Sequence, residues 1–137
     1  MKTPPAAGAN HRVLIVEDDH VIAGNLYSFL EARGFLPDVA YSGPAALQRL
    51  QEQRFDAVLL DIGLPGMDGY EVARALRADD SLKGAFLVAL TGYARPEDLQ
   101  RAREAGFDRH LAKPASLEAL EEVLKSRSRA GGAAVRT

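Results

Sequence analysis

The sequence predicts an α/β domain, a parallel β-sheet of five strands with helices on both faces. Three observations support this fold class. Short apolar runs alternate with segments of helical periodicity five times along the 137 residues. The runs are continuous, as expected for parallel strands that are buried on both faces. Residues that start or stop helices stand between the runs, and helical crossovers are what connect parallel strands.

The five apolar runs are the predicted strands. They occupy residues 13–16, 35–40, 57–60, 85–90 and 107–112. The second run is the weakest. The third run ends directly on Asp61, and Leu64, Pro65 and Gly66 then turn the chain toward the next helix.

The first helix is predicted at residues 20–33, and Gly34 is a typical residue to end it. Its periodicity predicts one apolar stripe. The stripe contains Val21, Ile22, Asn25, Leu26, Phe29 and Leu30.

The starts of the other helices carry recognisable signals. The second helix is predicted at residues 44–53. Asp68 and Glu71 form an Asp-x-x-Glu pattern, which resembles a capping box, at the start of the third. Pro96 suits the first turn of the fourth, and the fifth begins near Ser116.

Length and composition indicate one domain at residues 11–126, between a flexible leader at 1–10 and a flexible, basic, non-helical tail at 127–137. No apolar run approaches the roughly 20 residues of a membrane span. Cysteine is absent, which excludes disulfides and thiolate metal sites. With no signal-like N-terminal segment, this favours the cytoplasm. The formal charge of −2 gives no overall basic field for nucleic acid.

Polar residues follow four of the five predicted strands. Ligands of open parallel sheets bind outside the carboxyl ends of the strands, so these residues are expected to converge. They are Glu17, Asp18, Asp61, Thr91 and Lys113. Each one alone is more commonly a turn, cap or solvated residue, and Asp19 suits a cap of the first helix. Their joint placement favours a functional site.

Such a cluster fits a hard cation and phosphoryl chemistry. Neighbouring carboxylates repel one another unless a cation neutralises them, and an oxygen-only set suits Mg²⁺ or Mn²⁺. His11 and His20 show no ligand spacing relative to these acids. An aspartate is ionised at neutral pH, so Asp61 needs no general base to act as a nucleophile. Lys113 supplies further positive charge, and Thr91 a hydrogen bond to a phosphoryl oxygen.

Four motifs in this order carry a resemblance to a known family. They are V-L-I-V-E-D-D at 13–19, L-L-D-I-G-L-P-G-M-D-G at 59–69, A-L-T-G-Y at 89–93 and A-G-F-D-R-H-L-A-K-P at 105–114. From about Val13 to Leu124, the sequence resembles the receiver domain of bacterial response regulators, the phosphoacceptor modules of two-component and phosphorelay signalling. The intervals also fit, with 30 residues from Asp61 to Thr91 (91 − 61) and 22 from Thr91 to Lys113 (113 − 91). The resemblance implies a flavodoxin-like sheet with strand order 2-1-3-4-5.

The resemblance also implies residue roles. Asp61 would accept a phosphoryl group from a histidine kinase or a histidine phosphotransfer protein. Asp18 would bind Mg²⁺ directly, Glu17 through water, and Gly63 through its backbone carbonyl. Lys113 would pair with Asp61 and then with the phosphoryl group.

The resemblance also implies a conformational change that carries the signal, and it involves residues from Thr91 onward. The hydroxyl of Thr91 would move inward on phosphorylation, and the side chain three residues before Lys113 would follow it. This would remodel the face formed by the fourth helix, the fifth strand and the fifth helix, where a downstream protein would bind. That side chain is His110, where many relatives have Tyr or Phe. A histidine occurs in receivers similar to those of hybrid sensor kinases.

Two interpretations of His110 follow. It is either a smaller, titratable switch, because histidine changes charge near neutral pH, or a half-exposed residue with no switching role. Three accessory positions are also expected. Gly92 follows Thr91 in its turn, Tyr93 would cover the aspartyl phosphate and slow its hydrolysis, and the bond to Pro114 would be cis.

Other functions fit these residues less well. A Mg²⁺-dependent aspartate-nucleophile phosphohydrolase is the main alternative, but such enzymes usually carry a second acid where this chain has Gly63, and also a cap domain. Flavin binding would require a phosphate-binding loop after the first strand, where Glu17 and Asp18 would repel a phosphate. The chain is therefore not expected to be an enzyme, beyond self-catalysed phosphoryl transfer and autodephosphorylation.

The receiver interpretation leaves three forms open. The chain is a stand-alone regulator, a phosphorelay intermediate, or a receiver from a larger hybrid kinase. The Met start and the non-helical tail favour the first. We expect a monomer or weak dimer that binds neither nucleic acid nor membrane.

Overall fold

The structure is a computed structural model that describes residues 11–92, 95–113 and 116–133. The expected leader at 1–10, together with Tyr93 and Pro114, lies outside the described residues. Five strands form one sheet. They are β1 (Arg12–Val16), β2 (Leu36–Ala40), β3 (Ala57–Asp61), β4 (Phe86–Thr91) and β5 (Arg109–Ala112). All neighbouring pairs are parallel, and the order β2-β1-β3-β4-β5 confirms the prediction.

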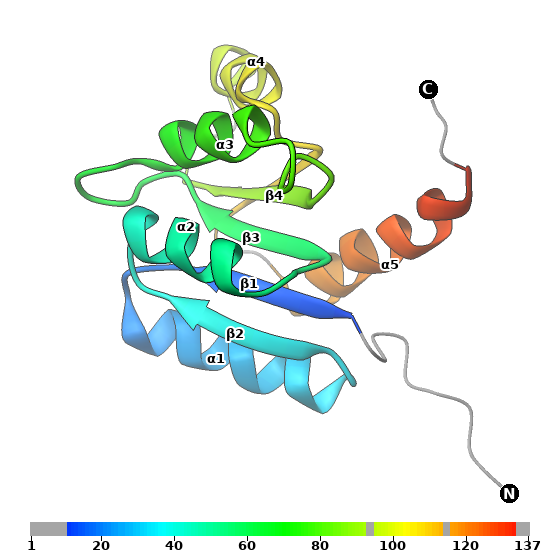
Figure 1. The fold of residues 1–137 in the computed structure, drawn as a ribbon. Coiled ribbons are helices and arrows are strands. Elements are labelled where there is room, and N and C mark those ends of the chain that lie inside the picture. Colours follow the sequence, from blue (N-terminus) through cyan, green and yellow to red (C-terminus); the bar gives the residue numbers. More distant parts are fainter. Residues whose placement is uncertain (1–10, 93–94, 114–115, 134–137) are drawn as a thin grey trace, which may run out of the picture.

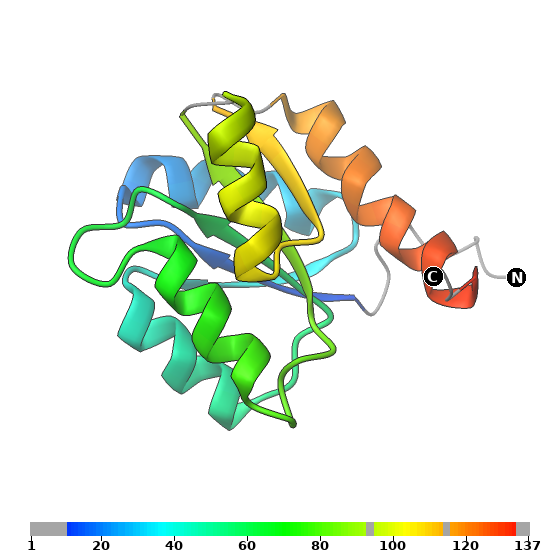
Figure 2. The ribbon, with the colours of Figure 1, turned by 90° about the horizontal axis from the view of Figure 1, so that it is seen from above.

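Helices cover both faces of this sheet (Figures 1 and 2). They are α1 (His20–Ala32), α2 (Gly43–Glu52), α3 (Gly69–Ala78), α4 (Pro96–Ala105) and α5 (Leu117–Ala133). Figure 1 shows α1 and α5 on one face and α2, α3 and α4 on the other. No helix among the described residues is long and apolar enough to cross a membrane.

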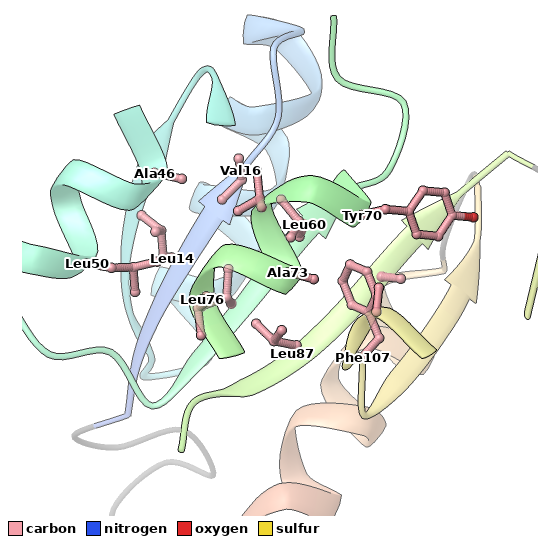
Figure 3. Close-up of a cluster of buried hydrophobic side chains, with 14 of the residues drawn as sticks. Leu14, Val16, Ala46, Leu50, Leu60, Tyr70, Ala73, Leu76, Leu87 and Phe107 are labelled. Carbon is pink, nitrogen blue, oxygen red and sulfur yellow. The ribbon is translucent and has the colours of Figure 1, made fainter. Parts of the chain in front are cut away.

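The apolar runs are continuous because successive strand residues point into two different cores. Leu14 and Val16 pack with Leu60 into the core beneath α2, α3 and α4 (Figure 3). Val13 and Ile15, from the same strand, pack into the core beneath α1 and α5. Each strand residue of β1 after Arg12 is therefore buried, whichever face it points to.

The predicted caps are confirmed at two helices, α1 and α3, and Ser116 also caps the start of α5. The Asp19 carboxylate accepts hydrogen bonds from the backbone N–H groups of Val21 and Ile22 at the start of α1. Asp68 and Glu71 form a complete capping box at the start of α3. Ser116 Oγ accepts a hydrogen bond from Ala119 N in the first turn of α5. These caps satisfy backbone donors that helical hydrogen bonds leave unused.

The predicted stripe of α1 is wrong at its N-terminal end. The buried residues are Ala23, Leu26 and Leu30, which recur at helical spacing. Val21 and Ile22 are exposed instead, Val21 to 71%. Apolar residues occupy more of this helix than one buried face needs, so the sequence pattern alone did not fix its rotation.

The C-terminal segment also differs from the prediction. A non-helical tail was expected after residue 126, but α5 continues to Ala133. Arginine and alanine are good helix formers, and they occupy four of the seven positions from 127 to 133. Residues 134–137 lie outside the described part of the chain.

Candidate functional site

The sheet brings the predicted strand-end residues to one edge. Glu17 follows β1, Asp61 ends β3, Thr91 ends β4, and Lys113 follows β5. Glu17, Asp61 and Thr91 are 2%, 4% and 5% exposed, and they are the buried polar side chains of the described residues. Polar groups are seldom buried without a reason, so their concentration at one edge marks a site.

Lys113 connects the two buried carboxylates. Its Nζ lies 3.2 Å from Oδ1 of Asp61 and 3.6 Å from Oε1 of Glu17. The backbone N–H of Lys113 donates to the carbonyl of Thr91 at 2.7 Å, which fixes the end of β5 beside β4. One ammonium group therefore faces two carboxylates, and the site retains negative charge.

Backbone donors hold both carboxylates in place. The N–H of Gly63 donates to Oδ1 of Asp61 at 3.0 Å, and the N–H of Asp19 donates to Oε2 of Glu17 at 3.1 Å. Oε1 of Glu17 is buried and accepts no hydrogen bond. An acceptor in that position is costly unless another group binds it.

Burial and neighbouring charge shift two pKa values. Burial raises the pKa of Glu17, and the nearby Asp61 carboxylate raises it further, against the lowering effect of the Asp19 N–H and of Lys113. Burial lowers the pKa of Lys113, but the combined attraction of Asp61 and Glu17 outweighs this and raises it. The site thus favours a proton or another cation close to Glu17.

Three carboxylates are arranged to hold a metal ion. Oxygens of Glu17, Asp18 and Asp61 all lie within 4.8 Å of one another, with Asp18 on the exposed side. The set contains only oxygen donors, and one of its residues, Glu17, has a buried Oε1 that accepts no hydrogen bond. It therefore fits a hard cation such as Mg²⁺.

His110 does not join this cluster. It is exposed on β5, opposite Ala89 of β4 in the sheet register, and borders a shallow groove with Leu99 and Arg109. Its switching role stays a prediction. Gly92 is exposed next to Thr91, whereas Tyr93 and Pro114 lie outside the described residues.

Sequence reasoning missed an apolar surface beside the carboxylates. The exposed side chains of Val21, Ile22 and Leu117 lie at the starts of α1 and α5. An open pocket of about 460 Å³ brings Ile22 and Leu117 together with the site residues Glu17 and Lys113. It is lined by Glu17, Ile22, Asn25, Leu26, Leu90, Lys113 and Leu117. The sequence feature that could have indicated this surface is the surplus of apolar residues in α1.

The other rim of the site is aromatic. The rings of His20 and Tyr41 stack with their centroids 3.9 Å apart. His20 starts α1 and Tyr41 directly follows β2, so the stack joins these two segments.

Glu17→Gln is predicted to stabilise the metal-free protein at neutral pH. The folded state raises the pKa of Glu17, so its ionised form costs stability at pH values above that raised pKa. Glutamine removes this cost, and we expect a gain of about 0.5–2 kcal/mol at pH 7. The gain should shrink as the pH falls toward 4.5, the ordinary value, because Glu17 is then protonated.

Urea unfolding at pH 7 and at pH 4.5, without divalent ions, measures this effect. Glu122→Gln, an exposed change on α5, is the matched control and should alter stability little. A Glu17→Gln protein no more stable than the wild type at pH 7 would contradict the predicted cost.

A family model described as "Response regulator receiver domain" matches residues 13–125. Among curated proteins, the chain is 34% identical over 114 residues to the polar-differentiation response regulator DivK of Brucella anthropi, covering 83% of this chain and 93% of DivK. It is 38% identical over 118 residues to the DNA-binding response regulator MtrA of Mycobacterium tuberculosis, covering 86% of this chain and 50% of MtrA.

The virulence sensor protein BvgS of Bordetella bronchiseptica is 37% identical over 136 residues, covering 89% of this chain. The chain spans only 11% of the length of BvgS. Among solved structures, the chemotaxis protein CheY4 of Vibrio cholerae has a TM-score of 0.82 at 30% identity, covering 86% of this chain and 98% of CheY4.

Proposed function

Because the chain belongs to the response regulator receiver domain family, we propose that Asp61 accepts a phosphoryl group from a phosphohistidine of a partner protein. The family makes the chain a receiver domain of two-component signalling. One observation carries the assignment of Asp61: a buried carboxylate at the end of β3 lies 3.2 Å from Lys113 and beside two further acids.

The transfer needs positioning and charge neutralisation more than covalent chemistry by the protein. An oxygen of Asp61 attacks the phosphorus, a P–O bond forms, and the P–N bond to the histidine breaks with its electron pair left on the imidazole. Lys113 lies where it can neutralise charge on the phosphoryl oxygens, and the hydroxyl of Thr91 can donate a hydrogen bond to one of them.

We propose that four groups hold a metal ion. Glu17, Asp18 and Asp61, whose oxygens lie close together, and the carbonyl of Gly63 would hold Mg²⁺, which supplies positive charge to the phosphoryl oxygens when bound. Gly63 adjoins the acceptor, because a Cβ at this position would lie 3.7 Å from Asp61 Oδ1. We propose that the same set serves autodephosphorylation, with water as the nucleophile.

The phosphohydrolase alternative lacks support in the site. An acid that protonates a leaving group is expected two residues after the nucleophile, and Gly63 stands there. The family is a signalling family, which favours the receiver function. We therefore propose phosphoryl uptake and loss at Asp61 as the chemistry of the chain.

The apolar surface that Ile22 and Leu117 form beside Glu17 and Lys113 is the proposed docking site of the phosphohistidine donor. A donor must bring its imidazole to Asp61, at this edge of the sheet. Exposed apolar side chains next to a charged site are typical of a protein interface. The downstream partner is proposed to bind the face formed by α4, β5 and α5, where His110 is exposed.

Incubation with Mg²⁺ and acetyl phosphate tests the assignment of Asp61. We expect the mass of the intact protein to increase by one phosphoryl group in the wild type and not in Asp61→Asn. Asp56→Asn is a matched control, because Asp56 precedes β3 at the opposite end of the strand. Phosphoryl uptake that survives in Asp61→Asn, or sustained release of phosphate from unrelated esters, would reject this function.

A further inference from the structure

Arg77 lies near the C-terminal end of α3, the end remote from Asp61, and its side chain joins three segments of the chain. Arg77 Nε donates to the carbonyl of Gly106 at 2.9 Å, and Nη1 donates to the carbonyls of Lys83 and Ala85 at 2.5 and 2.7 Å. Nη2 donates to Oδ2 of Asp108 at 2.8 Å. The side chain thus connects the end of α3 to the loop before β4 and to the turn between α4 and β5. We call these contacts the Arg77 clasp.

The clasp is closely fitted to the turn that ends α4. Gly106 has φ +109°, and a Cβ there would lie 2.6 Å from Cγ of Arg77. The Asp108 carboxylate that Arg77 binds also accepts the backbone N–H of Leu87 at 2.9 Å. The start of β5 is thereby held to β4 and to α3 at once.

The opposite end of α3 rests on the phosphoacceptor strand. Gly69 N donates to the carbonyl of Ile62 at 3.0 Å, immediately after Asp61. A Cβ on Gly69 would lie 2.6 Å from Cα of Ile62, so the helix start and the strand end touch through their backbones. Helix α3 therefore contacts the residue after Asp61 at one end and the turn at Gly106 at the other.

Helix α4 is attached unevenly along its length. Its buried residues are Ala102 and Ala105, both in the C-terminal half, where the clasp also lies. Arg101, near its middle, places its guanidinium 4.1 Å from the ring centroid of Tyr70 on α3. Pro96 and Glu97 in the first turn are exposed, and Arg95 Nε donates to Oδ2 of Asp98 at 3.1 Å within this start of the helix. Segments with few buried contacts open most readily, so the N-terminal half is the more easily displaced.

Building on the proposed function, we propose that Arg77 is a positioning residue that anchors the C-terminal end of α4. The conformational change after phosphorylation then pivots α4 about Gly106. The N-terminal half of α4 moves, and residues 102–109 stay fixed relative to Asp61. Figures 1 and 2 show α3 and α4 side by side on one face of the sheet, as this arrangement requires.

The arrangement of the four hydrogen-bond acceptors around position 77 requires an arginine. Its planar guanidinium offers several N–H groups in fixed directions, and the four acceptors that it binds are separate oxygen atoms. A lysine would keep the charge next to Asp108 but could not reach all of these oxygens from one ammonium nitrogen. Arg77→Lys should therefore restore the clasp only in part.

Amide hydrogen exchange read by mass spectrometry tests the anchor, with and without beryllofluoride and Mg²⁺. In the wild type, we expect beryllofluoride to change exchange in residues 96–101 and to leave residues 102–109 unchanged. In Arg77→Gln, residues 102–109 should exchange about tenfold faster before any addition, as expected from the loss of several hydrogen bonds. The change caused by beryllofluoride should then extend into residues 102–109.

Arg74→Gln is the matched control, because Arg74 is exposed on the same helix and should behave as the wild type. Unchanged exchange of residues 102–109 in Arg77→Gln would overturn the proposal, as would a beryllofluoride effect on those residues in the wild type. If Arg77→Gln does not fold, Arg77→Lys supplies the comparison, with an intermediate rate expected. Failure of the wild type to take up a phosphoryl group would instead reject the proposed function, while the exchange rates without beryllofluoride still test the anchor.

Discussion

Lys113→Ala is expected to destabilise the metal-free protein by about 2 kcal/mol at pH 7, because it leaves the buried carboxylates of Glu17 and Asp61 without their cation. Full burial of such a pair would give a larger loss, but the Lys113 side chain is 30% exposed and water screens part of the charge. The same change should slow phosphoryl uptake from acetyl phosphate by about 10²–10³-fold, as for the loss of one donor to a developing charge.

The pH dependence has a definite sign. The folded state raises the pKa of Lys113, so its stabilising effect is fully present below 10.5, its ordinary value, and is lost as the pH rises through the folded-state pKa. At acidic pH the deficit of Lys113→Ala should also shrink, because the raised pKa of Glu17 favours its protonated form, which no longer repels Asp61. Mg²⁺ should restore more stability to the variant than to the wild type, since it replaces the missing positive charge.

Urea unfolding at pH 5, 7 and 9, with and without Mg²⁺, measures these effects. Lys125→Ala, on α5 and outside the site, is the control and should change stability by less than about 0.5 kcal/mol. Equal stability of Lys113→Ala and the wild type at pH 7 without Mg²⁺ would show that Lys113 does not neutralise the buried acids.

Gly69→Ala is expected to destabilise the fold by about 3 kcal/mol, at the upper end of the cost of overfilling a packed site. The new Cβ would lie 2.6 Å from Cα of Ile62 and 2.8 Å from the carbonyl oxygen of Asp61. These are backbone atoms, which cannot move aside as a flexible side chain can. Because the strand end would have to shift, phosphoryl uptake at Asp61 should fall as well.

Gly24→Ala provides the comparison for this change. Gly24 lies on α1, and a Cβ at this position would have nothing within 4 Å, so alanine should stabilise that helix by about 0.5–1 kcal/mol. Thermal unfolding and acetyl phosphate uptake of the two variants are measured together. A Gly69→Ala protein as stable as Gly24→Ala would mean that α3 does not rest on β3 as described.

Much of the fold was predictable because its signals are local. The run before Asp61 is apolar at every position, and this follows directly from a strand buried on both faces. The cap at Asp68 could be recognised from Glu71 three residues later, because both partners lie within one helical turn. The position of each strand end then followed, and with it the convergence of Glu17, Asp61, Thr91 and Lys113.

Other features could not be predicted because they depend on how elements pack. The rotation of α1 decides that Val21 is exposed and Ala23 is buried, although both are apolar. His110 is exposed on β5, and the neighbours of a strand residue are set by the sheet and helices around it. The Arg77 clasp joins residues 29 and 31 positions apart, and no pattern in the sequence indicates such partners.

By itself, the sequence determined the parallel α/β fold, the family and the residues that meet at the strand ends, because periodicity, caps and motif spacing are properties of the chain itself. Only the tertiary structure decided the burial of Glu17, its contact with Lys113, the exposed apolar surface beside the site and the anchoring of α4. These depend on distances between residues remote in sequence, and packing alone sets those distances.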